Sequence, residues 1–367
     1  MTTRNQSLDV LRGVAIILVL LCHYSQALSL GSALLEVGGC GVDLFFVLSG
    51  FLISGLLFSE FERTGRINIC RFLIRRAFKI YPPFYLLLAS TALFFLIFAR
   101  SVPMVLLADA VFLQNYLPHF WEHGWSLAVE EHFYVFLPAL LLLLIKLHCR
   151  RNSRNPFRVL PVVSIGLSAL CLYLRIVALK RGADLTHIEF PTHLRADALF
   201  AGVTLGYFSK FDSESFREAG KRWVIVAGLF FAIAVVLLPP VPRLTFAYVA
   251  SSFVVAWAVN QPSRNRLASR ALAWVGLYSY SIYVWHVVAM LFLPRLPNRW
   301  FRFPVYFAIA VGFGVLMAKL IEVPTLALRD RLFPSRQPNA GGPPESSSEV
   351  SSSESTELPC AEAAGQT

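Results

Sequence analysis

The chain has 367 residues, of which 56% are hydrophobic and 15% charged, and its mean hydropathy is +0.60. This composition excludes an ordinary soluble enzyme and is typical of a protein with many membrane spans. The net charge of +11 indicates basic loops on the cytoplasmic side of a membrane before it indicates a nucleic-acid partner. The six cysteines are scattered without a C-x-x-C pair, which argues against a disulfide framework and a zinc knuckle.

The first apolar stretch, residues 8–26, is long enough to cross a membrane. It is too long for the core of a signal peptide and lacks a small-residue cleavage site, so we interpret it as a retained span. Within it, Arg12 and His23 lie about 16 Å and three helical turns apart, on one face. A snorkelling arginine and a structural histidine are the simple alternative. Because ionisable groups in lipid must face protein or water, we favour a polar stripe that faces a site.

Nine further apolar segments predict spans, at 40–58, 82–99, 125–147, 158–179, 194–209, 222–238, 243–259, 272–293 and 303–323. A run at 104–117 is shorter and contains Asp109, Gln114 and Asn115, so we interpret it as re-entrant or interfacial. The strongly basic loops then all lie inside, together with both termini. The predicted fold class is an all-α, polytopic transmembrane helix bundle of about ten spans with a re-entrant segment.

The composition changes abruptly at residue 334. Residues 334–367 are rich in Ser, Glu and Pro and have almost no large apolar side chains, so burial cannot offset the entropy cost of ordering them. We predict a disordered cytoplasmic tail and assign residues 1–333 to one transmembrane domain. Any activity is then expected in the membrane part.

Polar clusters interrupt the apolar segments in two layers. The inner layer holds Arg12, the run RFLIRRAFKIYPP at 71–83 and Glu322, which we expect to pair with Arg12 across helices. The outer layer holds His23, Asp43, the run WSLAVEEHFY at 125–134, the run PTHLRADALFAG at 191–202, and His286. Single polar residues often only join helices, but so many clusters from different spans favour a lined cavity.

The basic run contains Arg71, Arg75, Arg76 and Lys79 and comes just before Pro82 and Pro83, where we expect a helix to begin. An anchor for anionic lipid is one interpretation. The other is a phosphate clamp, because the guanidinium fork matches phosphate geometry.

A short string, His119-Phe-Trp-Glu122-His123, matches the H-x-x-E-H pattern of zinc proteases. That pattern needs a helix to bring both histidines to one face. Pro118 precedes the string and Gly124 follows it, so we expect a surface loop and no metal site.

Several strings, in this order, resemble the acyltransferase-3 family of bacterial membrane O-acyltransferases: LDVLRGVAIILVLLCH, FFVLSGFLIS, RRAFKIYPPFY, WSLAVEEHFY, THLRADALFAG, YSYSIYVWH and IEVP. The resemblance covers about residues 8–325. It implies transfer of an acyl group, usually acetyl from acetyl-CoA, to a sugar hydroxyl in acceptors such as lipopolysaccharide, peptidoglycan, exopolysaccharide or macrolides. The expected setting is the bacterial inner membrane.

The resemblance also implies roles for single residues. The essential Arg and His of the family's first span fall on Arg12 and His23, and its last-span Glu falls on Glu322. The paired-arginine motif falls on Arg76 and Lys79, so this chain has Lys where the family has a second Arg, and a lysine lacks the bidentate fork.

We therefore expect Arg12, His23 and Glu322 to be catalytic, with neutral His23 as the base that takes the proton of the acceptor hydroxyl. Acyl transfer through an acyl-histidine is an alternative route. Arg75, Arg76 and Lys79 are expected to hold acetyl-CoA or another acyl-CoA. The residues expected to bind the carbohydrate acceptor or orient His23 are Asp43, Trp125, Ser126, Glu130, Arg195 and Asp197. The rival interpretation is a proton-coupled transporter, although the inverted repeats common in transporters are not visible.

Overall fold

The computed structural model describes residues 5–28, 32–149, 155–222, 228, 238–261, 266–291 and 299–333, and these residues form helices and connecting turns without a β-strand. In chain order the elements are α1 (Gln6–Leu28), α2 (Ser32–Thr64), α3 (Ile69–Phe98), α4 (Leu106–Ala110), η1 (Glu122–Gly124), α5 (Trp125–Cys149), α6 (Leu160–Lys180), α7 (Leu185–Glu189), η2 (Thr192–Leu194), α8 (Ala196–Phe211), α9 (Ser213–Arg222), α11 (Pro240–Val259), α12 (Leu267–Leu277), α13 (Ser279–Met290), α14 (Arg299–Met317), the π-helical turn η4 (Ala318–Glu322) and α15 (Val323–Leu332). The all-α prediction is confirmed.

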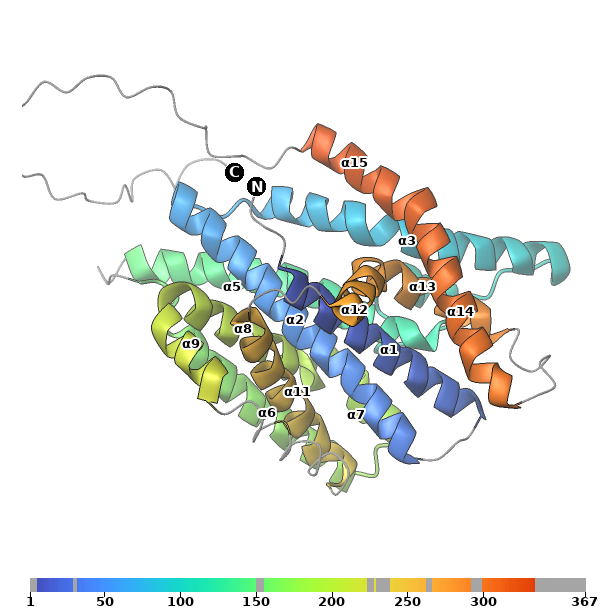
Figure 1. Ribbon diagram of the computed structural model, residues 1–367, viewed down its shortest axis with the longest axis horizontal. Helices are drawn as coiled ribbons and strands as arrows, with labels where there is room; N and C mark the ends of the chain where they lie inside the picture. Colours follow the sequence, from blue (N-terminus) through green and yellow to red (C-terminus); the bar gives the residue numbers. More distant parts are fainter. Residues whose placement is uncertain are drawn as a thin grey trace, which may run out of the picture.

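Helices α1 and α2 pack against each other in the middle of the bundle (Figure 1). Helix α8 packs on α2, and α6 and α11 pack on α8, on the lower side of the view. Helix α12 packs on α1, and α13 on α14. Helices α3 and α15 lie together on the opposite, upper side. The first span of the chain is therefore covered by protein on several sides, as a helix with interior ionisable residues requires.

Seven described helices are long and apolar enough to cross a membrane, and the pair α12–α13, bent by 77°, raises this number to eight. Of the ten expected spans, 194–209 corresponds to the shorter helix α8, and most of 222–238 lies outside the described residues. A multi-pass membrane protein is confirmed. The expected tail at 334–367 also lies outside the described residues.

The segment at 104–117 does not form a spanning helix. It contains the five-residue helix α4 followed by turns. Asp109 accepts a hydrogen bond from the Phe120 backbone N–H at 2.9 Å, and the Gln114 amide donates to the Gly124 carbonyl at 2.8 Å. These side chains satisfy the backbone of a loop that packs on protein, in the way expected for irregular chain at membrane depth.

Helix α3 begins earlier than the sequence predicted. Asn68 caps it, because the Asn68 side chain accepts a hydrogen bond from the Arg71 backbone N–H at 2.9 Å. Pro82 and Pro83 lie inside the helix, so the predicted helix start at the prolines is wrong. Proline removes helix hydrogen bonds, and membrane helices tolerate it where neighbours supply substitutes. The Tyr280 hydroxyl donates to the Ile80 carbonyl at 2.5 Å beside this break in the ladder.

Close helix crossings in the bundle depend on glycine. A Cβ added at Gly50 of α2 would collide with the Leu199 carbonyl of α8, and one added at Gly202 of α8 would lie 2.7 Å from the backbone nitrogen of Phe51. Small residues let helix backbones approach closely in membranes, where packing takes the place of the hydrophobic effect. The α2–α8 contact therefore fixes the position of the central helix that lines the site described below.

We predict that Gly202→Ala destabilises the protein by about 1–3 kcal/mol, the usual cost of overpacking. The matched control is Gly55→Ala, because an added Cβ at Gly55 would have nothing within 4 Å. Alanine in a helix is favoured over glycine by about 1 kcal/mol, so the control should keep or raise the melting temperature. Thermal unfolding of the purified protein in detergent measures both, and equal melting temperatures for the two variants would contradict the close crossing.

Candidate active site

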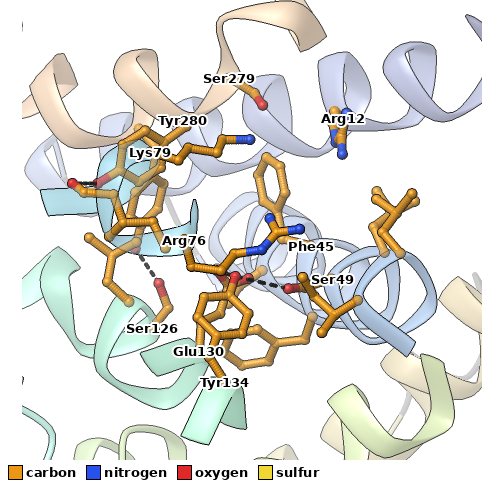
Figure 2. A pocket seen from close by; sticks show the side chains of 18 of the residues that line it. Arg12, Phe45, Ser49, Arg76, Lys79, Ser126, Glu130, Tyr134, Ser279 and Tyr280 are labelled. Carbon is orange, nitrogen blue, oxygen red and sulfur yellow. Dashed lines mark hydrogen bonds between the residues drawn. The ribbon is translucent and has the colours of Figure 1, made fainter. Parts of the chain in front are cut away.

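A cavity of about 270 Å³ opens between five helices, α1, α2, α3, α5 and α13 (Figure 2). Most of its wall is apolar, supplied largely by α2. The charged and polar side chains of the wall are Arg12, Ser49, Arg76, Lys79, Ser126, Glu130, Tyr134, Ser279, Tyr280 and Tyr283. Five of the residues predicted for the site, Arg12, Arg76, Lys79, Ser126 and Glu130, thus meet in one cavity although they come from three helices.

Two cations of this cavity come from one face of α3. Arg76 and Lys79 are three residues apart, which places them on the same side of a helix, and Figure 2 shows both side chains extending into the cavity. The Arg76 guanidinium lies 5.7 Å from the ring centre of Phe72 and 5.9 Å from that of Tyr134. Neither Arg76 nor Lys79 forms an ion pair with a residue that the structure describes. They are positioned to meet an anion within the cavity.

The third cation is Arg12 of α1. Its Nη1 donates to Asp9 Oδ1 at 2.9 Å, one turn earlier in the same helix. The expected direct pair of Arg12 with Glu322 is therefore wrong, since Asp9 is close in the same helix and supplies the counter-charge. Lys79 lies near both residues, and its ammonium is repelled by Arg12 and attracted by Glu322.

Glu322 ends the π-helical turn η4 and is buried. Its Oε2 accepts a hydrogen bond from Ser281 Oγ of α13 at 2.6 Å. π-Helical turns are rare and frequently mark functional sites. In this turn the Glu322 carboxylate binds α13 and lies outside the lining of the cavity.

One face of α5 carries the polar side of the cavity, because Ser126, Glu130 and Tyr134 are spaced by four residues. The Tyr134 hydroxyl donates to Glu130 Oε2 at 2.8 Å and lies 3.2 Å from Ser49 Oγ. Ser126 Oγ lies 2.6 Å from the Tyr283 hydroxyl, which in turn donates to the His123 carbonyl. Ser126 and Tyr283 form the part of the wall nearest to three histidines.

His23 does not line the cavity. Its Nδ1 donates to the Val19 carbonyl at 3.0 Å, and its ring centre lies 4.7 Å from that of His286. The His286 ring is 5.3 Å from His123, and the Nε2 atoms of His123 and His286 are buried without a hydrogen-bond partner in the described part of the chain. Three imidazoles thus form a cluster behind Tyr283, whose ring centre is 5.8 Å from His123 and 5.9 Å from His286.

No sequence pattern predicts that His123 and His286 belong to this cluster. From the sequence, His286 is expected only in the outer layer, and His123 only within the zinc-protease string. That string forms a short 3₁₀ turn at Glu122–Gly124, and the His119 Nδ1 binds the Leu117 carbonyl at 3.1 Å. In the described ranges, no group of three or more His, Cys, Asp or Glu is arranged to hold a metal ion.

Two of the predicted acceptor-binding residues are buried in an ion pair. Arg195 Nη2 donates to Asp43 Oδ1 at 2.7 Å, and both side chains are about 3% exposed. The Arg195 guanidinium also lies 5.6 Å from the ring centres of Phe46 and Trp125. Trp125 stacks on Phe190 at 5.0 Å. Asp43, Trp125 and Arg195 thus pack with one another at the end of α5 and do not line the cavity.

Asp197 is paired in the same region with Arg175 of α6, and both side chains are almost completely buried. Glu189, in the short segment before α8, lies near Arg195, and burial raises the pKa of its carboxyl while Arg195 opposes that rise. These carboxylates balance the arginines of a packed layer that joins α2, α6 and α8.

A family model described as an acyltransferase domain matches residues 5–319. Peptidoglycan O-acetyltransferase OatA of Listeria monocytogenes is 28% identical over 355 residues, which cover 87% of this chain and 55% of that protein. O-acetyltransferase OatA of Staphylococcus aureus is 27% identical over 358 residues, covering 86% of this chain and 56% of that protein. The chain thus spans just over half the length of these curated relatives. No solved structure matches it.

The ion pair of Asp43 and Arg195 leads to a prediction about stability. Removing one partner of a buried pair leaves an uncompensated charge and typically costs about 3–5 kcal/mol, whereas replacing both by apolar residues is often neutral. Asp43→Leu and Arg195→Met should each lower the melting temperature in detergent strongly, and the double variant should recover most of the loss. Single variants with an unchanged melting temperature but a raised KM for the acceptor would instead place these residues in the acceptor site.

Proposed function

Because the chain belongs to the acyltransferase-3 family, we propose that it is a membrane O-acyltransferase that moves an acyl group, in the simplest case acetyl, from acyl-CoA to a hydroxyl of a carbohydrate or glycosylated acceptor. The observation that carries this proposal is the cavity between α1, α2, α3, α5 and α13, which combines apolar walls with two cations that have no ion-pair partner among the described residues. One end of the cavity lies beside the histidine cluster. A long, thin donor with phosphates at one end and a thioester at the other fits this distribution of charge.

Arg76 and Lys79 are the residues that we propose to hold donor phosphate. Arg76 supplies a planar fork that can bind two phosphate oxygens. Lys79 supplies a point charge, and Glu322 and Arg12 influence it electrostatically. The apolar wall from α2 can cover the phosphate-free arm of the donor, which carries the thioester towards Ser126 and Tyr283.

His23 is the proposed general base. Because its Nδ1 donates to the Val19 carbonyl, the lone pair lies on Nε2. His23 Nε2 takes the proton of the acceptor hydroxyl, and the resulting alkoxide forms a bond to the thioester carbonyl carbon. The carbon–sulfur bond then breaks, and the sulfur leaves as a thiolate that is protonated to give free CoA.

Ser126 and Tyr283 separate the cavity from the imidazoles. Their hydroxyls are 2.6 Å apart, and the Tyr283 ring packs near His123 and His286. Direct transfer with His23 as the base therefore requires Ser126 and Tyr283 to move apart when both substrates bind. The transfer would take place where the donor cavity and the histidine cluster meet.

The proposed acceptor is a carbohydrate in a bacterial plasma membrane setting, with both termini of this chain in the cytoplasm. One relative is named for peptidoglycan, which makes peptidoglycan the first acceptor to test. Lipopolysaccharide, exopolysaccharide and glycosylated small molecules are the further candidates.

Incubation of purified protein with labelled acetyl-CoA and each candidate glycan tests the proposal. An acyltransferase releases CoA only when an acceptor is present and transfers the label to the glycan. A proton-coupled transporter would release no CoA with any acceptor, and that result would overturn the proposal.

We predict that His23→Ala lowers the rate of transfer at least 100-fold, since a general base usually contributes about 10²–10⁴-fold. His187→Ala is the matched control, because the His187 side chain is 76% exposed and pairs only with nearby Asp184 among the described residues. The control should keep the wild-type rate. Turnover of the His23 variant above about a tenth of the wild-type rate would exclude the proposed base.

We predict that Arg76→Ala raises the apparent KM for acyl-CoA about tenfold or more, because a hydrogen bond to a charged group contributes about 1.5–3 kcal/mol. Lys79→Arg should be tolerated, since it keeps the charge and restores the guanidinium fork. Steady-state kinetics with the donor and the acceptor varied separately distinguish the two sites. If only the KM for the acceptor changed, Arg76 would bind the acceptor and not acyl-CoA, which would contradict the proposal.

A further inference from the structure

A second cavity, of about 220 Å³, adjoins the first, and the two share Leu56 and Arg76 in their walls. Its lining is Leu56, Glu60, Arg63, Arg71, Phe72, Arg75, Arg76 and Arg329. The lining has five guanidinium groups and one carboxylate, and Asp330, just outside it, pairs with Arg75 and Arg329. The five arginines still outnumber the two carboxylates, so a multiply charged anion is the ligand that would stabilise the arrangement.

Three helices build this second cavity, and the last of them is distant in sequence from the other two. Helix α2 contributes Glu60 and Arg63 near its end, α3 contributes Arg71 and Arg75 one turn apart, and α15 contributes Arg329. Figure 1 shows α15 lying on the same side of the bundle as α3. Arg329 therefore lines the basic cavity only when the last helix is docked.

Arg75 docks this last helix. Its Nη2 donates to Asp330 Oδ1 at 3.0 Å, and its Nη1 donates to the Phe333 carbonyl. The Phe333 ring packs 5.9 Å from Phe78 of α3. Asp330 also accepts hydrogen bonds from the Arg329 guanidinium at 2.9 and 3.0 Å. Arg75, predicted to bind phosphate, thus holds α15 in the position that brings Arg329 to the cavity.

We propose that the second cavity binds the phosphorylated nucleotide end of acyl-CoA, with the 3′-phosphate of its ribose among Arg63, Arg71 and Arg329. This inference rests on the proposed function, in which acyl-CoA is the donor. The order of groups along the donor matches the order of the cavities. From the thioester, a phosphate-free arm leads to a pyrophosphate and then to a ribose that carries a phosphate monoester. The apolar cavity, the shared Arg76 and the arginine-rich cavity follow in the same order.

An anionic phospholipid headgroup shares the phosphate chemistry of the donor and is the other source of such a ligand. A headgroup phosphate is a diester, whereas the nucleotide end carries a pyrophosphate and a monoester that reaches two negative charges near neutral pH. Dephospho-CoA differs from CoA only in lacking the 3′-phosphate. The comparison of these two ligands in bilayers of defined composition therefore separates the two sources.

The test measures the Kd of CoA and of dephospho-CoA for the full chain in nanodiscs of phosphatidylcholine alone. The wild-type protein should bind CoA about tenfold or more tightly than dephospho-CoA, since each charged hydrogen bond contributes about 1.5–3 kcal/mol. Arg329→Gln should weaken CoA to the level of dephospho-CoA and leave dephospho-CoA unchanged. Arg331→Gln, exposed on the same helix and outside the cavity wall, is the matched control and should bind as the wild type does.

Arg63→Gln should repeat the effect of Arg329→Gln and serves as the second variant if the first does not fold. Equal Kd values for CoA and dephospho-CoA in the wild type, with acyl transfer intact, would overturn this inference and leave the proposed function standing. Absence of CoA binding and of transfer would overturn the proposed function itself. If Arg329→Gln reduced the binding of phosphatidylglycerol added to the nanodiscs but not that of CoA, the cavity would be a lipid site.

Discussion

The high free-energy cost of an unpaired charge inside a membrane bundle determines where most polar side chains of this protein lie. Such a charge must pair with another or face a space that admits water or a ligand. Arg195 and Arg175 follow the first course, with Asp43 and Asp197 as their partners. Arg76 and Lys79 follow the second and extend into the cavity. This division separates the residues that hold the helices together from those that are available to a substrate.

The same constraint explains why the paired layer and the cavity lie side by side. Glycines at the α2–α8 crossing bring the two backbones close together. The ion pair of Asp43 with Arg195, at the start of α8, joins the same two helices at a second place. With α2 held in this way on one side, its opposite side can remain apolar and line the cavity. A weakened α2–α8 contact would therefore alter the shape of the donor site without touching any residue in it.

Sequence patterns predicted the helical class, most of the spans and five residues of the cavity wall, because hydropathy and interior charges are local signals. They could not tell which interior charges pair with each other. Asp43 and Arg195 are 152 residues apart, so each alone has the pattern of a site residue. His23, His123 and His286 come from α1, the turn η1 and α13, so no local sequence pattern predicts that they cluster. Pro82 and Pro83 suggested a helix start, but α3 begins at the Asn68 cap and contains both prolines in its interior.

The position of α3 gives the basic run two functions in place of one. Consecutive residues of a helix point about 100° apart, so Arg75 and Arg76 cannot serve the same ligand in the same way. Arg75 faces α15 and fixes the helix that carries Arg329, whereas Arg76 lies in the wall shared by both cavities. Lys79, one turn further, reaches only the apolar cavity. Lys79 thus lies in the apolar cavity, whereas the arginines of the run line the basic cavity in which we propose that the donor phosphates bind.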